Sequence, residues 1–484
     1  MGGAIENGNR MELMSRICLY IFVAITTIGF LSGCHNPFGQ NSRVDSSYTP
    51  GYTAPAPSGP TSATVTATTD AGSTCAPANQ SVNLGGFATF TVTASAGYVL
   101  NSSVGGTCPA GAWSGSSYTT GAIASNCSVN FTSTATTPTV TNGLIETTSV
   151  TYSSGNANVS LSWQAPTDSG TPSADQKYKI CYSSTDPSYN SFSTSVEVSA
   201  GTCTTETGST TASLTIAAGH AYYLNIIVTN PAGSSALYSA KAEFLDPSEV
   251  AYFPLEGNGN DVTGSNNFTA ASYNGTTATA GAYGTDRFGN SSAAYNFGSN
   301  NTGACLMTGT NISSSVTGTS ARSVAFWMSP VDAGTTFDPF SFGESQAARG
   351  EHFGLRYDTG QTLYGIWGYG DDYYSTAGLT TGWQFWVVTY SGGTGSPIGA
   401  IYRNGTQALL NTSFSPDYNT AGTPFFLGCD IDGSLGTSGS LGQWFSGSIS
   451  AVRIFSRVLC DGTGTNGCAS STDEIANMYN SSRP

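Results

Sequence analysis

One run of aromatic and acidic residues carries the clearest potential for chemistry. Positions 364–374 read YGIWGYGDDYY, which interleaves aromatic rings with glycines and ends in carboxylates and tyrosines. Sugars present C–H faces that stack on aromatic rings and hydroxyl groups that hydrogen-bond to carboxylates. Strand alternation places Ile366 on the face opposite Trp367 and Tyr369. The run predicts a carbohydrate contact, with core packing or loop capping as the competing interpretation. The five candidate side chains are Trp367, Tyr369, Asp371, Asp372 and Tyr373.

Other acidic residues are candidates for a calcium ion. Asp430 and Asp432 have i, i+2 spacing, but Gly433 follows them, so the segment reads as a turn or a calcium loop. Asp261, in Gly-Asn-Asp, is more typical of a turn cap than of a calcium ligand. Apart from this optional calcium, the sequence predicts no cofactor.

Histidine is too scarce for several kinds of active site. The chain has three histidines, and His35 falls in an expected linker. His220 and His352 cannot form a histidine-rich metal site, and both are expected to be ordinary surface or packing residues. Serine or cysteine nucleophiles would lack an available base.

Length and composition indicate several secreted β-modules in series. At roughly 100–200 residues per domain, 484 residues allow about three domains. Charged residues make up 9%, against about 25% in typical domains. The net charge of −15 repels a phosphate backbone, so nucleic acid is excluded as a partner.

The N-terminus has the layout of an export signal. Two arginines precede an apolar run at 17–30 that is too short to span a bilayer comfortably. The segment Leu31-Ser32-Gly33-Cys34 resembles the bacterial lipobox. The resemblance implies removal of 1–33 and acylation of Cys34, with a chance cysteine near the cleavage point as the alternative. A Pro/Ser/Gly/Thr-rich linker is expected at 34–61.

Residues 62–136 show short alternating runs separated by glycine pairs, which is typical of hairpins. The runs Gly85-Gly86-Phe87, Gly105-Gly106-Thr107-Cys108 and Asn126-Cys127-Ser128-Val129 resemble the divergent internalin-type B repeat of bacterial surface proteins. The resemblance implies a small all-β spacer or interaction module without catalytic activity.

Residues 137–246 alternate apolar and polar positions, as a β-sandwich requires. The run from Leu214 to Tyr222, continued at steps of two through Val228, resembles the E–F corner and F strand of a fibronectin type III domain. The resemblance implies a corner role for Tyr222, a core position for Trp163 and an exposed turn position for His220.

Residues 247–484 form the largest expected domain, and its motifs are VAYFPLEGNGND at 250–261, SVAFWM at 323–328, WQFWVVTY at 383–390 and FSGSISAVRIF at 445–455. Their order resembles the laminin G-like jelly roll of the concanavalin A-like lectin/glucanase superfamily. The resemblance implies core positions for Trp327, Trp383 and Trp386. It gives no support to a calcium ion at Ser450-Ala451, where the family often has an acidic pair. The superfamily's endoglucanases carry Glu-x-Asp-x-x-Glu or a close variant on a strand, and this chain has none.

Cysteine positions predict disulfides inside each module. Eleven cysteines, less Cys18 in the signal and Cys34, leave nine in an oxidising compartment. Cys75 is then spare, although it could replace either partner of the first pair. The expected pairs are Cys108–Cys127, Cys181–Cys203, Cys305–Cys429 and Cys460–Cys468.

The sequence therefore predicts an all-β, multidomain chain: a small β-repeat module, a fibronectin type III sandwich and a C-terminal concanavalin A-like jelly roll. The one helical stretch, 473–479, would be capped by Thr472 or Asp473. The expected function is a lipid-anchored protein of the outer membrane or cell surface whose jelly roll binds a glycan or surface macromolecule without catalysis. A purely structural surface protein and, less favoured, a polysaccharide hydrolase acting through Asp430 and Asp432 are the alternatives.

Overall fold

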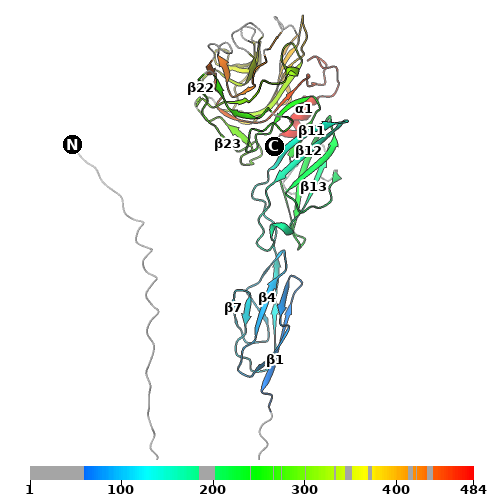
Figure 1. Ribbon diagram of the computed structural model, residues 1–484, viewed down its shortest axis with the longest axis vertical. Coiled ribbons are helices and arrows are strands. Elements are labelled where there is room, and N and C mark those ends of the chain that lie inside the picture. The colour runs from blue at the N-terminus through cyan, green and yellow to red at the C-terminus, as the bar shows by residue number, and fades with distance from the viewer. Residues whose placement is uncertain are drawn as a thin grey trace, which may run out of the picture. The chain divides into compact units, whose positions relative to one another are not determined.

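A computed structural model of the chain contains mainly β-strands, as the composition predicts (Figure 1). It describes residues 59–184, 202–239, 241–264, 266–273, 275–299, 301–331, 334–343, 351–368, 373–412, 418–420, 422–432 and 440–483. The predicted signal at 1–33, Cys34 and nearly all of the predicted linker lie outside these ranges. No helix in the described part of the chain is long and apolar enough to cross a membrane.

The first module contains two four-stranded sheets and a short strand pair. Along β1 every second residue is buried, namely Ala63, Val65 and Ala67, because alternate side chains face the module's core. The first sheet has the order β3-β1-β9-β6: Asn79–Asn83, Ser62–Thr69, Cys127–Phe131 and Gly105–Gly106. The second has the order β2-β4-β8-β7: Ser73–Ala76, Thr89–Ala94, Ser117–Thr119 and Ala112–Ser114. The pair joins β5 (Tyr98–Leu100) and β10 (Ser133–Ala135).

The second module is a two-sheet sandwich. Trp163 is 5% exposed in its core, as the sequence predicts. His220 is exposed as predicted, but it is the first residue of a strand and pairs with Leu245, so it is not a turn residue. Tyr222 is buried. One sheet has the order β11-β12-β15: Ile145–Ser153, Asn156–Trp163 and Thr211–Ala217. The other contains β14 (Thr202–Cys203), β13 (Lys177–Ser183), β16 (His220–Thr229), β17 (Ser235–Leu237) and β18 (Lys241–Leu245). The fibronectin type III assignment itself stays a prediction.

The C-terminal module is a larger sandwich of an eight-stranded and a seven-stranded sheet (Figure 1). The eight-stranded sheet has the order β23-β24-β37-β26-β31-β32-β33, with β19 also paired to β37. Their bounds are Ala282–Gly284, Ala294–Asn296, Gly447–Phe455, Arg322–Pro330, Gln384–Tyr390, Gly399–Arg403, Thr406–Asn411 and, for β19, Glu249–Phe253.

The seven-stranded sheet contains two of the five predicted ligand contacts, Trp367 and Tyr373. Its order is β20-β25-β34-β27-β28-β29-β30: Phe268–Ala270, Leu306–Thr308, Phe426–Leu427, Phe337–Gly343, His352–Asp358, Leu363–Trp367 and Tyr373–Gly378. Two small pairs complete the module: β21 (Ser272–Tyr273) with β22 (Thr276–Thr277), and β35 (Asp430–Asp432) with β36 (Ser440–Gly442).

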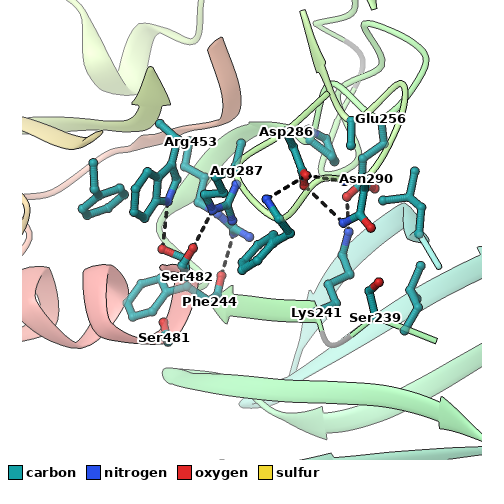
Figure 2. Close-up of a pocket in the computed structure, with 18 of the residues that line it drawn as sticks. Ser239, Lys241, Phe244, Glu256, Asp286, Arg287, Asn290, Arg453, Ser481 and Ser482 are labelled. Atoms are coloured by element: carbon teal, nitrogen blue, oxygen red, sulfur yellow. Dashed lines mark hydrogen bonds and ion pairs between the residues drawn. The ribbon is translucent and has the colours of Figure 1, made fainter. Parts of the chain in front are cut away.

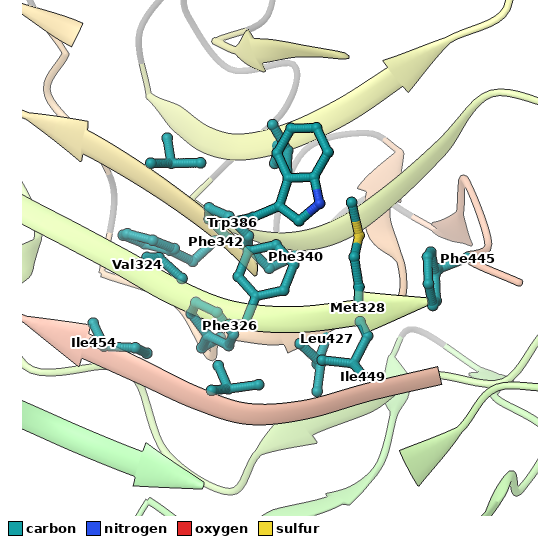
Figure 3. Close-up of a cluster of buried hydrophobic side chains, with 14 of the residues drawn as sticks. Val324, Phe326, Met328, Phe340, Phe342, Trp386, Leu427, Phe445, Ile449 and Ile454 are labelled. Atoms are coloured by element: carbon teal, nitrogen blue, oxygen red, sulfur yellow. The ribbon is translucent and has the colours of Figure 1, made fainter. Parts of the chain in front are cut away.

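The main core lies between these two sheets (Figure 3). Each sheet contributes alternate residues, such as Phe326 from β26 and Phe340 from β27. Their rings meet edge to face, with centroids 5.6 Å apart. Burying one such side chain contributes about 1.5–3 kcal/mol. Trp386 is 0% exposed in this core, and Trp327 is 2% exposed in a second cluster. Trp383 packs against that second cluster and is partly buried.

Strand β26 is apolar on both faces because both faces are covered. Val324, Phe326 and Met328 face the main core, whereas Ala325 and Trp327 face the second cluster with residues of α1 (Glu474–Ser482). Helix α1 begins where predicted, because Asp473 accepts a hydrogen bond from the Ala476 N–H at 2.7 Å.

The described part of the chain contains four disulfides, and they are the pairs that the sequence predicts: Cys108–Cys127, Cys181–Cys203, Cys305–Cys429 and Cys460–Cys468. Cys75 is a half-buried free thiol. Burial raises the pKa of this thiol.

Candidate ligand-binding site

The seven-stranded sheet has one face on the main core and one face turned away from it, here called the outer face. Along β28, Phe353, Leu355 and Tyr357 belong to the core. Strand alternation therefore sends the side chains of His352 and Arg356 to the outer face.

Arg356 is the centre of a polar cluster on the outer face. Its Nε and Nη2 donate to the two oxygens of Asp338 at 2.7 and 2.8 Å, and Nη2 also donates to Asp430 Oδ2 at 2.7 Å. The guanidinium lies 3.5 Å from the centroid of the Trp367 ring. His352 completes the cluster, with Nδ1 3.7 Å from Asp430 Oδ1. Elements far apart in the sequence thus meet at one guanidinium.

Burial decides the charges of this cluster. Asp338 and His352 are 0% exposed. Burial raises the pKa of Asp338 to about 7, although the neighbouring Arg356 favours the ionised form. Burial also lowers the pKa of His352 to about 3, so its imidazole is neutral near pH 7. The cluster therefore holds two acids, one permanent cation and one neutral imidazole.

Glycine and a disulfide make room for this cluster and fix it. A Cβ on Gly354 would lie 2.9 Å from the Phe340 carbonyl oxygen and 3.1 Å from His352 Nε2, so only glycine leaves space for the imidazole. The Ser341 hydroxyl donates to the Cys429 carbonyl at 2.9 Å, and Cys429 is bonded to Cys305. These contacts fix the residue immediately before Asp430.

Of the five predicted carbohydrate contacts, the structure places Trp367 on the outer face and Tyr373 elsewhere. Trp367 is half-buried at the end of β29, and Ile366 lies in the main core, as alternation predicts. Tyr373 begins β30, which runs antiparallel to β29, and this position fits the competing interpretation of core packing. Tyr373 pairs with Ile366 and packs against the core. Tyr369, Asp371 and Asp372 lie outside the described residues.

Of the calcium candidates whose side chains the structure describes, Asp430 lies in the cluster and Asp261 does not. The predicted loop at Asp430–Asp432 is wrong: it is strand β35, because Ile431 is buried in an apolar cluster and Asp430 pairs with Arg356. The Asp432 side chain lies outside the described part of the structure.

Asp261 caps a loop, which is the interpretation that the sequence favours over a calcium ligand. Its Oδ1 accepts from the backbone N–H groups of Tyr252 and Thr263 and from the Thr263 hydroxyl. Its Oδ2 accepts from the backbone and side-chain N–H groups of Asn266. Both oxygens are therefore engaged inside the loop.

Sequence reasoning missed Asp338 and Arg356 and expected His352 to be an ordinary residue. A usable signal was present: His352, Gly354 and Arg356 alternate with three core residues and so mark a polar face on a buried strand. No local signal indicates that Asp338 and Asp430 lie beside Arg356, because strands far apart in the sequence bring them together.

A pocket lies where the second module meets the C-terminal sandwich (Figure 2). Its polar side chains bond to one another: Lys241 contacts Glu256, Arg287 donates to the Ser482 carbonyl, and the Asp286 carboxylate accepts from Asn290. Because these polar groups already bond within the pocket, we interpret it as part of the contact between the two modules, here called the seam. The outer face is the stronger binding candidate.

An ion network closes the same seam. Arg453 on β37 donates to Glu249 at 2.9 Å, to Glu243 at 2.6 Å and to the Phe244 carbonyl at 2.8 Å. It also lies 3.5 Å from the Tyr252 ring centroid. Burial raises the pKa of Glu249 to about 8. Cationic Lys241 and Arg453 outweigh burial at Glu243 and lower its pKa.

Comparison with known families gives the C-terminal sandwich its classification. Residues 300–462 match the family model described as Laminin_G_3, concanavalin A-like lectin/glucanases superfamily. These residues form a laminin G-like domain. No curated protein matches the chain.

Solved structures similar to the chain include domain 4 of AbnA, a GH43 extracellular arabinanase from Geobacillus stearothermophilus, in complex with arabinotriose. It has 18% identity and a TM-score of 0.34, over 45% of this chain and 97% of the other. The binding domain of Paraclostridial Mosquitocidal Protein 1 has 14% identity and a TM-score of 0.34, over 48% and 52%. A heptameric SAP-like pentraxin from Limulus polyphemus has 17% identity and a TM-score of 0.24, over 30% and 70%.

Proposed function

We propose that the laminin G-like domain binds carbohydrate on its outer face and that Trp367 makes the main stacking contact. The observation that carries this proposal is the position of Trp367: half-buried on the outer face, with its ring held against the Arg356 guanidinium. A fixed indole has already lost its rotamer freedom, so stacking a sugar on it costs little entropy. The matched superfamily includes lectins by its description.

The proposal extends to the cellular role predicted from the sequence. The protein would be exported, anchored by lipid at Cys34 and presented at the outer membrane or cell surface, where glycan binding serves adhesion or envelope attachment. The aromatic and acidic run around Trp367 and the lipobox-like segment support this role.

The proposed activity is binding without catalysis. A glycosidase needs an acid and a second carboxylate that both reach the substrate. Asp338 and Asp430 are 0% and 2% exposed and bond to the same guanidinium, so neither carboxylate faces an open cleft.

A glycan array tests this proposal, with residues 59–484 applied in the presence and absence of calcium. We expect binding to a defined set of glycans, reduced about tenfold by Trp367→Ala because one ring–sugar contact of up to about 1.5 kcal/mol is lost. Trp383→Ala is the matched control, since Trp383 is also half-buried but packs beside the eight-stranded sheet.

An array with no binding under either condition would favour the purely structural role. Release of reducing ends from polysaccharides, lost in Asp430→Asn, would instead establish a hydrolase.

A further inference from the structure

Three buried side chains on the outer face are arranged so that together they could bind one metal ion. Asp338, His352 and Asp430 each offer one ligand atom, and these atoms lie within 4.8 Å of one another. Asp338 and His352 lie on the paired strands β27 and β28, and the Cys305–Cys429 disulfide holds the residue next to Asp430 before any ion binds.

The imidazole of His352 is aimed into this set without a bond of its own. Neither Nδ1 nor Nε2 has a hydrogen-bond partner among the described residues, although the ring is 0% exposed. Burying such polar atoms without a hydrogen-bond partner is unfavourable. A bond to a ligand at Nδ1, which faces Asp430 Oδ1 at 3.7 Å, would remove part of this cost.

The charge of the cluster also favours a cation. With both acids ionised, Asp338 and Asp430 carry two negative charges and Arg356 one positive charge. Arg356 hydrogen-bonds to both carboxylates and so orients them. In known metal sites, hydrogen bonds from neighbouring residues orient the carboxylate ligands in the same way.

We propose that Asp338, His352 and Asp430 bind one divalent transition-metal ion of the Zn²⁺ type. One imidazole nitrogen with two carboxylate oxygens suits zinc and related ions, whereas calcium prefers six to eight oxygen ligands. Bonds of about 2.0–2.2 Å in a tetrahedron place ligand atoms about 3.4 Å apart. The observed 3.7 Å between His352 Nδ1 and Asp430 Oδ1 is close to this spacing.

This site differs from the calcium sites considered from the sequence, because it uses a nitrogen ligand and neither Asp261 nor Asp432. The fourth zinc position would be open to water or to a ligand oxygen. The proposal does not depend on glycan binding, since its test needs only the ion.

Isothermal titration of residues 59–484, purified without a polyhistidine tag and stripped with EDTA, tests this inference. We expect one Zn²⁺ per chain and no comparable binding of Ca²⁺. His352→Gln should weaken Zn²⁺ binding at least 100-fold, and Asp430→Asn at least tenfold. His220→Gln is the matched control: this range contains only two histidines, and His220 is exposed in the second module. Its affinity should equal that of the unsubstituted protein.

A second measurement covers the case in which the buried substitutions prevent folding. X-ray absorption of the zinc-loaded, unsubstituted protein should report about four nitrogen or oxygen neighbours, including one imidazole and no sulfur. Absence of stoichiometric Zn²⁺ binding would overturn the proposal. So would unchanged affinity in a folded His352→Gln protein, or sulfur ligation through Cys75.

Discussion

At the scale of single residues, Arg356 organises the outer face. One guanidinium bonds three carboxylate oxygens and stacks on Trp367, so it links the candidate sugar contact to two buried acids. Arginine suits this position because its planar fork donates in two directions while its flat face covers an aromatic ring.

Replacing Arg356 by methionine should destabilise the protein by about 3–5 kcal/mol, because two buried carboxylates lose their common cation. Arg356→Lys should destabilise the protein less, since lysine keeps the positive charge but lacks the planar set of N–H donors. Urea denaturation measures both changes. Arg403→Met is the control: Arg403 is half-buried and donates to the Gly378 carbonyl, and we expect a loss below about 1.5 kcal/mol. Equal losses at the two arginines would contradict the role given to Arg356.

The sequence predicts residue positions well where one strand decides them. Alternation correctly separates Trp367 from Ile366, and local polarity correctly marks Asp473 as a helix cap. The aromatic run is not one strand, because β29 ends at Trp367 and Tyr373 begins the antiparallel strand β30. Local sequence patterns do not predict the contact between Asp338 and Arg356, because the two residues become neighbours only when β27 and β28 pair.

At the scale of elements, β18, β19 and β37 meet at Arg453. Burial raises the pKa of Glu249, whereas Lys241 and Arg453 outweigh burial at Glu243 and lower its pKa. The two carboxylates share one guanidinium, and the ionised form is better stabilised at Glu243, where Lys241 adds a second cation at 3.5 Å.

Glu249 should make stability depend on pH. Its pKa is about 8 in the folded protein and 4.5 ordinarily. Between these values the folded protein keeps a proton that the unfolded chain has released, so this group makes stability fall as pH rises from about 4.5 to 8. The slope is at most about 1.4 kcal/mol per pH unit, and it vanishes above pH 8.

Glu249→Gln removes this slope, so its stability relative to the unsubstituted protein should rise from pH 5 to pH 8. Denaturant midpoints at several pH values measure the difference. The exposed Glu206 supplies the control, and Glu206→Gln should leave the pH profile unchanged. A pH-independent difference for Glu249→Gln would show that this carboxylate titrates normally.

At the scale of the whole molecule, the all-β class, the C-terminal jelly roll and the disulfides follow from the sequence, because alternation and cysteine grouping are local signals. The seam between the second and third modules does not. Phe244 ends the second sandwich yet packs on Phe455 of the third, with ring centroids 6.0 Å apart. A chain cut at 247 therefore separates residues that share a core.

The laminin G-like module alone, residues 247–484, should melt roughly 10 °C below residues 137–484. It loses Glu243 and Phe244 and leaves Arg453 with fewer partners, a loss of about 3–5 kcal/mol at about 2–4 °C per kcal/mol. Scanning calorimetry measures the difference. Removing residues 59–136 instead should change the melting temperature of that module by less than about 2 °C. Equal melting temperatures for 247–484 and 137–484 would show that the seam adds no stability.

The bond between Cys305 and Cys429 has a consequence for where the protein can work. Cys429 precedes Asp430 directly, so reduction would release the segment that brings this acid to Arg356. Thiols stay reduced in the cytosol and oxidise outside it. The proposed binding surface would then form only under oxidising conditions, and a chain that is still reduced would lack it.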